Sequence, residues 1–270
     1  MGKNYVVFTD LDGTLLDKKY SFRKALPALR LLKRKKIPLI INTSKTRAEI
    51  EVFRKKLGNN DPFVSENGGA IFIPKNYFPF KYDFNKVKGK YKVIEIGLPT
   101  EKVKKKLNEI KKKFSGRIYF LFSEARAKEV ARDSGLSLKM AVKAKKREYT
   151  ETFKVEGNRE EIKKLARRSG MHFTEGTNYF HLMGNNNKGK AVRILMKLFR
   201  KKSGRIVSVG LGDAANDMEM LMEVDKAFLV QKYNKKFFKL KRAKKVRGIA
   251  SIGWNKAIKE LVRENEGKNR

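Results

Sequence analysis

The sequence contains no cysteine and only two histidines, His172 and His181. The missing cysteines exclude disulfides and thiolate-bound metals, and two histidines are too few for a metal site built on imidazoles. No apolar run approaches the roughly 20 residues that a membrane-spanning helix needs, and the start of the chain lacks the pattern of a signal peptide. We therefore expect a soluble, cytoplasmic protein with no membrane partner.

Acidic residues are scarce as well: 28 Asp and Glu stand against 66 Lys and Arg, which gives a formal net charge of +38. Two explanations of this large positive charge remain open. One is nucleic-acid binding, in which clustered cations meet phosphates. The other is a lysine-rich, stabilising surface that also attracts an anionic substrate. The basic residues are spread along the whole chain and form no nucleic-acid-binding motif, so we expect nonspecific binding at most.

Repeated strand, polar turn and helix patterns are what the chain does contain. The apolar run Val6–Phe8 ends in Asp10 and Asp12, and the run 37–41 leads to Thr43 and a helix. The run 206–209 ends in an acidic turn before another helix. This alternation predicts an α/β fold with a doubly wound parallel sheet.

The middle of the chain has a different pattern, because strands alternate there with short helices and lack such polar turns. Residues 83–182 are therefore expected to form an inserted α+β module. The core would then consist of residues 1–82 and 183–270. Sequence length agrees with this division, since 270 residues suit one large domain or two modest ones.

The polar turns are expected to lie together at one edge of the parallel sheet. Because the carboxyl ends of parallel strands lie at one edge of a sheet, the turns predict a common site. Its candidate members are Asp10, Asp12, Thr43, Lys188, Asp213 and Asp217. Carboxylates, a hydroxyl and an ammonium group suit Mg²⁺ and phosphoryl transfer.

Each residue type suggests a role in that chemistry. Asp10 would attack phosphorus, and Asp12 would protonate the leaving alcohol and later deprotonate a water molecule. Thr43 and Lys188 would hold the phosphoryl oxygens. The metal residues would be Asp10, Asp12 (through a backbone carbonyl near it), Asp213 and Asp217. Asp217 and Asn216 could also hold metal-bound water or orient Lys188.

Simpler explanations exist for each feature taken alone. The Asp10 and Asp12 pair fits a solvated turn equally well, and Thr43 fits a cap of the following turn. Lys188 is one of many basic residues, and Asp213 and Asp217 fit helix caps. The run 210–215 also matches a loose dinucleotide fingerprint, which we discount because Asp213 would face the pyrophosphate.

The ordered set resembles the four motifs of the haloacid dehalogenase (HAD) superfamily of phosphatases. The motifs are Asp10-Leu11-Asp12-Gly13-Thr14, Thr43, Lys188 and the run 212–217. The resemblance implies a HAD-like core, Mg²⁺ and an aspartyl-phosphate intermediate. The long gap between Thr43 and Lys188 is where one subclass carries an α+β cap of the C2B type.

Three further runs, 43–49, 65–71 and 147–151, resemble the branch of the superfamily that converts mannosyl-3-phosphoglycerate to mannosylglycerate. This resemblance implies a small anionic phosphorylated substrate, with a sugar phosphate or glucosyl-3-phosphoglycerate as alternatives. It also implies substrate-binding residues at Ser44, Lys45, Glu66, Asn67 and Arg147.

One stretch departs from this branch. Relatives tend to carry Gly-Gly-Arg-Phe before the His-Leu-Met-Gly run, whereas this chain has Thr177-Asn178-Tyr179-Phe180. A missing arginine removes a contact to a carboxylate or phosphate, so the departure bears on the substrate. An alternative of another class is a nucleic-acid-binding protein on an inactive phosphatase fold. A nucleic-acid-binding protein has no need for the acidic residues of these motifs, because carboxylates repel phosphates.

Overall fold

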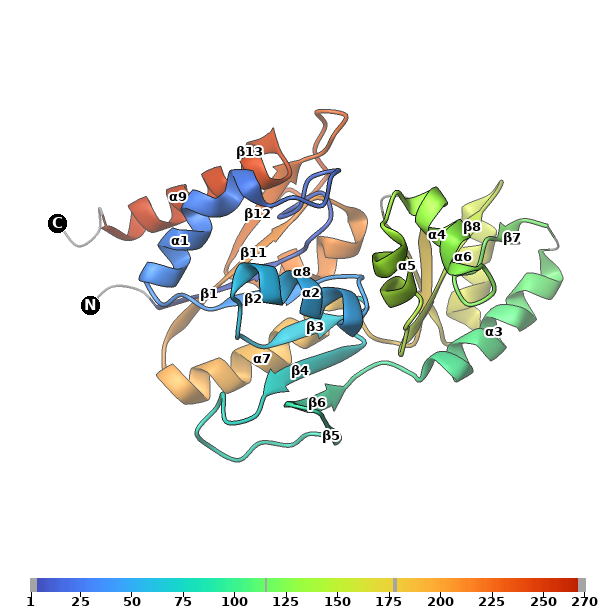
Figure 1. Ribbon diagram of the computed structural model, residues 1–270, viewed down its shortest axis with the longest axis horizontal. Helices are drawn as coiled ribbons and strands as arrows, with labels where there is room; N and C mark the ends of the chain where they lie inside the picture. The colour runs from blue at the N-terminus through green and yellow to red at the C-terminus, as the bar shows by residue number, and fades with distance from the viewer. Residues whose placement is uncertain (1–3, 115, 177–178, 267–270) are drawn as a thin grey trace.

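The computed structural model describes residues 4–114, 116–176 and 179–266, which form a larger and a smaller lobe (Figure 1). The larger lobe contains a nine-stranded sheet with the order β13-β12-β11-β1-β2-β3-β4-β6-β5. The smaller lobe contains a four-stranded sheet with the order β7-β8-β10-β9. Buried apolar side chains cluster in both lobes, so each sheet has hydrophobic packing of its own.

The strands of the large sheet run parallel from β13 to β3, and β4, β6 and β5 are antiparallel. Their bounds are β1 Asn4–Thr9, β2 Leu39–Asn42, β3 Phe63–Ser65, β4 Ala70–Pro74, β5 Lys86–Lys88, β6 Tyr91–Glu95, β11 Ile206–Gly212, β12 Lys226–Gln231 and β13 Lys244–Ile249. The antiparallel strands of the small sheet are β7 Ile118–Tyr119, β8 Thr150–Val155, β9 His172–Glu175 and β10 Phe180–Met183.

Helices cover both faces of the large sheet, and others flank the small one. Those of the larger lobe are α1 Leu26–Arg34, α2 Arg47–Leu57, α7 Lys188–Ser203, α8 Met218–Glu223 and α9 Ser251–Glu266, with short 3₁₀ turns at Arg23–Ala25 and Ala215–Asp217. Those of the smaller lobe are α3 Thr100–Lys113, α4 Ala127–Ser134, α5 Leu138–Ala144 and α6 Arg159–Arg168.

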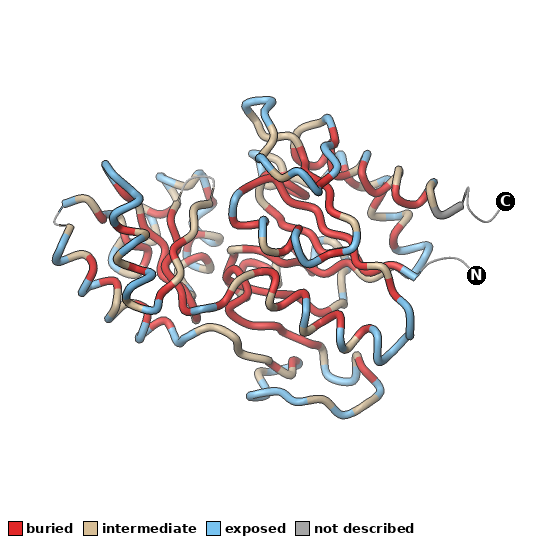
Figure 2. The backbone as a smooth tube through the Cα atoms, turned by 180° about the vertical axis from the view of Figure 1, so that it is seen from behind, coloured by how far each residue is buried: buried red, intermediate tan, exposed pale blue. Residues whose placement is uncertain are grey.

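The central strand β1 shows why the sheet is doubly wound. Val7 packs with the apolar side chains of α1, α2 and α9, whereas Val6 and Phe8 pack with those of α7 and α8. Successive side chains of a strand point to opposite faces, so a fully apolar run needs cover on both sides. Figure 2 shows the buried chain concentrated along the strands of each lobe. The predicted doubly wound α/β class is confirmed.

Local signals set the helix after β2. Thr46 and Glu49 form a capping box, in which each side chain bonds the other residue's backbone N–H. Gly58 ends α2 in the left-handed conformation at φ 60°, which glycine adopts at little cost. The capping box fixes where α2 starts relative to β2, and therefore where the intervening turn with Thr43 lies.

The expected start of the insertion at residue 83 differs from the sheet boundaries. Strands β5 and β6, which fall inside the range 83–182, hydrogen-bond into the large sheet through β4. The small sheet and its helices begin only after β6. Short amphipathic strands look alike in either sheet, so the sequence pattern does not reveal which sheet they join. Within the described ranges, no helix is long and apolar enough to cross a membrane.

Candidate active site

The carboxyl ends of β1 and β11 bring two acidic turns together. The strands are paired in register up to Thr9 and Leu211, and the backbone N–H of Asp10 donates to the Leu211 carbonyl at 3.0 Å. Gly13 has φ 74°, and a Cβ there would lie 2.7 Å from a carboxylate oxygen of Asp213. Glycine at this position therefore lets the two turns approach closely.

Lys188, the first residue of α7, lies between two of these carboxylates. Its buried Nζ is 2.8 Å from Oδ1 of Asp10 and 2.6 Å from Oδ1 of Asp217. Burial alone lowers the pKa of Lys188, but the two carboxylates outweigh burial and the net shift is upward. Lys188 therefore stays cationic at the centre of the site.

The second oxygen of Asp217 is also engaged. Its Oδ2 accepts hydrogen bonds from the backbone N–H groups of Asp213, at 2.9 Å, and Ala214, at 3.1 Å. Asp213 accepts a further hydrogen bond at 2.8 Å from the hydroxyl of Thr14. Asp217 thus holds both the acidic turn and Lys188 in place, which agrees with the orienting role considered for it.

Asp10, Asp213 and Asp217 form a buried group in which one ligand oxygen from each lies within 4.8 Å of the others. Burial raises the pKa of Asp10 to about 6, although Lys188 opposes the shift. Burial likewise raises the pKa of Asp213 well above its usual range, and the Asp217 carboxylate adds to the shift. Three carboxylates against one ammonium leave excess negative charge, and a hard divalent cation with oxygen ligands fits such a donor set.

Asp12 lies apart from this group. One of its oxygens is 2.8 Å from Nζ of Lys45, and its side chain is 39% exposed. Burial lowers the pKa of Lys45, but Asp12 and Glu49 raise it by more. The carboxylate of Asp12 therefore faces the cavity beside a cation rather than the other three acids. Metal binding at Asp12, expected through a backbone carbonyl there, stays a prediction.

Thr43 follows β2 and is fully buried. Its hydroxyl has no hydrogen-bond partner within the described part of the chain. A buried hydroxyl without a partner is unfavourable unless a ligand or water satisfies it. The observation agrees with a hydroxyl kept for a bound group, as expected from the sequence.

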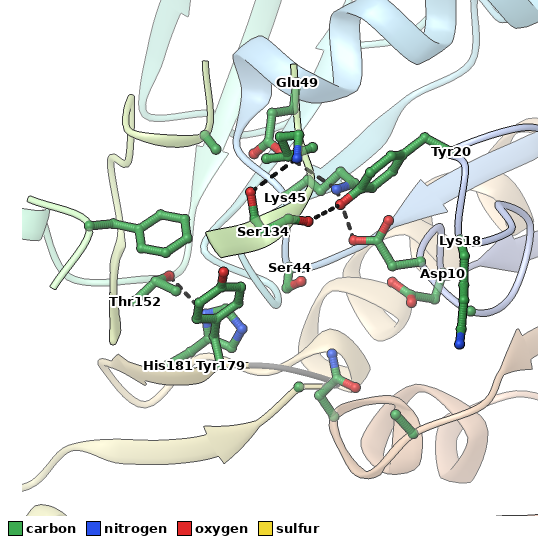
Figure 3. A pocket seen from close by; sticks show the side chains of 18 of the residues that line it. Asp10, Lys18, Tyr20, Ser44, Lys45, Glu49, Ser134, Thr152, Tyr179 and His181 are labelled. Atoms are coloured by element: carbon green, nitrogen blue, oxygen red, sulfur yellow. Dashed lines mark hydrogen bonds and ion pairs between the residues drawn. The ribbon is translucent and has the colours of Figure 1, made fainter. Parts of the chain in front are cut away.

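A cavity of about 420 Å³ opens beside these residues, between the two lobes (Figure 3). Of the predicted site residues, Asp10, Asp12, Ser44, Lys45 and Arg147 line it. Arg147 comes from the segment before β8 and donates to the Ser44 carbonyl at 3.2 Å and to the Thr150 hydroxyl at 2.6 Å. Its Nε is buried and has no partner among the residues described, so a donor remains available at the cavity.

Glu66 and Asn67 do not line this cavity. The carboxylate of Glu66 accepts hydrogen bonds from the backbone N–H groups of Glu148, at 2.9 Å, and Tyr149, at 3.0 Å, and from the Thr150 hydroxyl, at 2.6 Å. Burial raises the pKa of Glu66, and Arg147 and these donors only partly offset the rise. Glu66 therefore fastens the two lobes together in this structure.

Asn67 also makes a contact between segments rather than facing the cavity. Its Oδ1 accepts a hydrogen bond at 3.3 Å from Asn216. Thr177 and Asn178, at which the chain departs from the narrower family pattern, lie outside the described residues.

Sequence reasoning missed several lining residues, namely Lys18, Tyr20, Thr152, Tyr179, His181 and Tyr233. Tyr233 follows the parallel strand β12 but was not recognised as part of a motif, and Thr152, Tyr179 and His181 belong to the smaller lobe. Thr152 and His181 are directly opposite each other on β8 and β10. Their alternation on the strands predicts a shared face, but nothing local indicates that this face points at the large lobe.

The fold and the site define a hydrolase of the haloacid dehalogenase type. Residues 7–246 match the family model described as haloacid dehalogenase-like hydrolase, and the chain belongs to this family.

Among individual proteins, the chain is 45% identical to the glucosyl-3-phosphoglycerate/mannosyl-3-phosphoglycerate phosphatase of Methanococcoides burtonii, over 97% of this chain and 98% of that one. It is 38% identical to the mannosyl-3-phosphoglycerate phosphatase of Pyrococcus furiosus, over 83% and 90% of the two chains. A haloacid dehalogenase-like hydrolase from B. subtilis has the same fold, with a TM-score of 0.65, 17% identity and coverage of 95% and 99%.

Proposed function

We propose that this protein is a Mg²⁺-dependent phosphatase that removes phosphate from mannosyl-3-phosphoglycerate, giving mannosylglycerate, and accepts glucosyl-3-phosphoglycerate as well. The observation that carries the proposal is the placement of Asp10. Its carboxylate is 5% exposed, touches Lys188 and lines a cavity large enough for a phosphorylated small molecule. The names of the similar proteins support the choice of substrate.

In the proposed reaction, a carboxylate oxygen of Asp10 attacks phosphorus as the bond from phosphorus to the glycerate oxygen breaks. The product is an aspartyl-phosphate on Asp10 and an alcohol. Asp12 would give a proton to the leaving oxygen. It would then remove a proton from water, which attacks phosphorus as the bond from phosphorus to the Asp10 oxygen breaks, releasing inorganic phosphate and restoring the Asp10 carboxylate. Lys45, at 2.8 Å, holds Asp12 in place.

The transferred group carries negative charge, so positive and hydrogen-bonding groups around it lower the barrier. Lys188 and the unpartnered hydroxyl of Thr43 would hold its oxygens. Asp10, Asp213 and Asp217 would hold Mg²⁺, which supplies further positive charge to the phosphoryl oxygens when bound. Arg147 and Ser44 would contact the rest of the substrate.

The smaller lobe is proposed to act as a cap that selects the substrate and excludes water. The net charge of +38 supports a small anionic substrate, because a positive surface raises the encounter rate with anions. Nonspecific nucleic-acid binding and a cytoplasmic location stay predictions from the sequence.

Release of inorganic phosphate from mannosyl-3-phosphoglycerate tests the proposal, with and without Mg²⁺ and for Asp10→Asn and Asp10→Ala. The expected result is Mg²⁺-dependent turnover that both variants lose. Asp225→Asn is the matched control, because this carboxylate binds Ser208 away from the cavity. Full activity in the Asp10 variants would refute the mechanism. Faster turnover of simple hexose phosphates would refute the substrate.

A further inference from the structure

The two walls of the cavity differ in charge. The core wall carries six charged side chains, those of Asp10, Asp12, Asp17, Lys18, Lys45 and Glu49. The described cap residues on the opposite wall carry one formal charge, that of Arg147, when His181 is neutral. The others that bear on the argument are Phe122, Thr152, Gly176, Tyr179 and His181. Under the proposed function, the phosphate of the ligand lies at the core wall beside Asp10, and the part of the ligand under the cap meets a wall with little charge.

His181 is the polar group held most firmly in the cap wall. It is directly opposite Thr152 on neighbouring strands, and its Nδ1 lies 3.0 Å from the Thr152 hydroxyl. The residue is only 4% exposed. The hydrogen bond and the strand pairing fix the ring, so that its second nitrogen, Nε2, has a defined direction. Figure 3 shows the pair on the cap side of the cavity.

The ring is neutral, and space is left beside its second nitrogen. Burial lowers the pKa of His181 well below its usual range, and the cations of Arg147 and Lys188 lower it further. A Cβ on Gly176 would lie 3.2 Å from Nε2, so the glycine keeps this edge of the ring uncovered. A neutral imidazole fixed at Nδ1 offers one donor or acceptor at Nε2, which suits a hydroxyl better than a phosphate.

Aromatic rings complete this wall. Phe122 and Tyr179 meet edge to face with centroids 4.9 Å apart, and the Tyr179 hydroxyl is already bonded to Asp133 at 2.6 Å. Their ring surfaces are therefore apolar contacts rather than hydrogen-bonding groups. Apolar surface next to one precisely placed polar group is the usual composition of a site that orients an uncharged ligand.

We propose that His181, held by Thr152, hydrogen-bonds a hydroxyl of the substrate's sugar ring and so makes the enzyme select phosphates that carry a sugar. The inference rests on the proposed function and adds a specificity-determining pair to it. The ring of the sugar would lie against Phe122 and Tyr179, while the phosphate end reaches Asp10.

The test compares two substrates in each variant. Mannosyl-3-phosphoglycerate carries the sugar, and p-nitrophenyl phosphate does not. The measured quantity is the ratio of kcat/KM for the first to kcat/KM for the second. In His181→Phe the ratio is expected to fall about 10-fold or more, because a sugar hydroxyl is left without a partner. Thr152→Val, which frees the ring, should lower the ratio by about 3-fold.

A conservative variant and a matched control sharpen the result. In His181→Gln the amide reaches the position of Nε2 and should restore part of the ratio. His172→Gln changes the other histidine, which does not line the cavity, and should leave the ratio unchanged. Thermal melting of each variant shows whether it folds. If His181→Phe does not fold, the substrate ratios of the single variants His181→Gln and Thr152→Val test the inference.

An unchanged ratio in folded His181 and Thr152 variants would overturn the inference. A loss of activity that is equal on both substrates would do the same, since it indicates a structural role. These outcomes differ from failure of the proposed function, in which the wild-type protein itself would not hydrolyse the glycosyl substrates.

Discussion

The two walls of the cavity are built in different ways. On the core wall, Asp10 lines the cavity and contacts the buried Lys188 behind it, and the three carboxylates of Asp10, Asp213 and Asp217 exceed the charge of this one lysine. On the cap wall, Thr152 and His181 are brought together by antiparallel pairing and carry no net charge. Under the proposed function, the first wall would carry the phosphate chemistry and the second would recognise the uncharged part of the substrate.

Removing Lys188 should have the largest effect and should break the core wall alone. Lys188→Met is expected to lower kcat roughly 10²- to 10³-fold, because the transferred phosphoryl group loses its buried cation. The loss should be similar for substrates with and without a sugar, as measured by initial rates. Lys190→Met, on the same helix and outside the cavity, is the control. A loss limited to sugar-bearing substrates would contradict the division between the walls.

Metal addition should stabilise the protein through the core wall. At a Mg²⁺ concentration of 100 times Kd, binding to the folded state alone stabilises by about 2.7 kcal/mol. The rise in Tm on adding Mg²⁺ should disappear in Asp213→Asn and persist in Thr152→Val. Differential scanning calorimetry at constant ionic strength measures it, and Ca²⁺ and Na⁺ serve as comparisons. An equal rise in Asp213→Asn would show that Mg²⁺ binds elsewhere.

Glu66 tests how the walls are held relative to each other. In Glu66→Gln, the amide N–H₂ would face backbone N–H donors, and Arg147 would lose the carboxylate 3.8 Å away. We expect a loss of about 2 kcal/mol in the free energy of unfolding, measured with urea. Glu109→Gln, in an exposed ion pair on α3, should leave it almost unchanged. Equal effects in the two variants would mean that the buried contacts of Glu66 stabilise the protein no more than an exposed ion pair does.

Acidification should act on the cap wall. Because the pKa of His181 is lowered on folding, the folded state binds fewer protons than the unfolded state below the usual histidine value of 6.5. The stability from the neutral ring is present above that pH and is lost as pH falls toward the folded pKa. The free-energy difference between wild type and His181→Gln should shrink by up to about 1.4 kcal/mol per pH unit in that window. A difference that is constant from pH 7 to below about 5 would contradict a buried neutral ring, because that range crosses the histidine pKa.

Prediction from sequence succeeded where a signal lies within a few adjacent residues. The capping box of Thr46 and Glu49 and the glycine stop at Gly58 were readable in this way, and so was the doubly wound α/β class. Strand β13 was missed, because its lysine-rich sequence reads as a basic run. Exposed lysines on β13 suit the edge of a sheet, where charge prevents pairing with other molecules.

Prediction from the sequence was less complete for the contacts of the candidate site than for the elements of the fold. Asp10, Thr43, Lys188, Asp213 and Asp217 were expected at one edge, and all are buried near it. The contacts of Asp12 with Lys45, and of Glu66 with the start of β8, depend on partners that are remote in sequence or on another lobe. The catalytic and binding roles of all these residues stay predictions until the variants are measured.

The sequence by itself determined the α/β class, the family motifs and the order of the acidic turns, because each depends on apolar periodicity and on neighbouring residues. Only the tertiary structure decided that β5 and β6 join the large sheet, that Glu66 binds the smaller lobe and that His181 faces the cavity beside Thr152. Strand pairing and the packing of one lobe against the other set these contacts. They connect residues that are tens of positions apart, so no local pattern contains them.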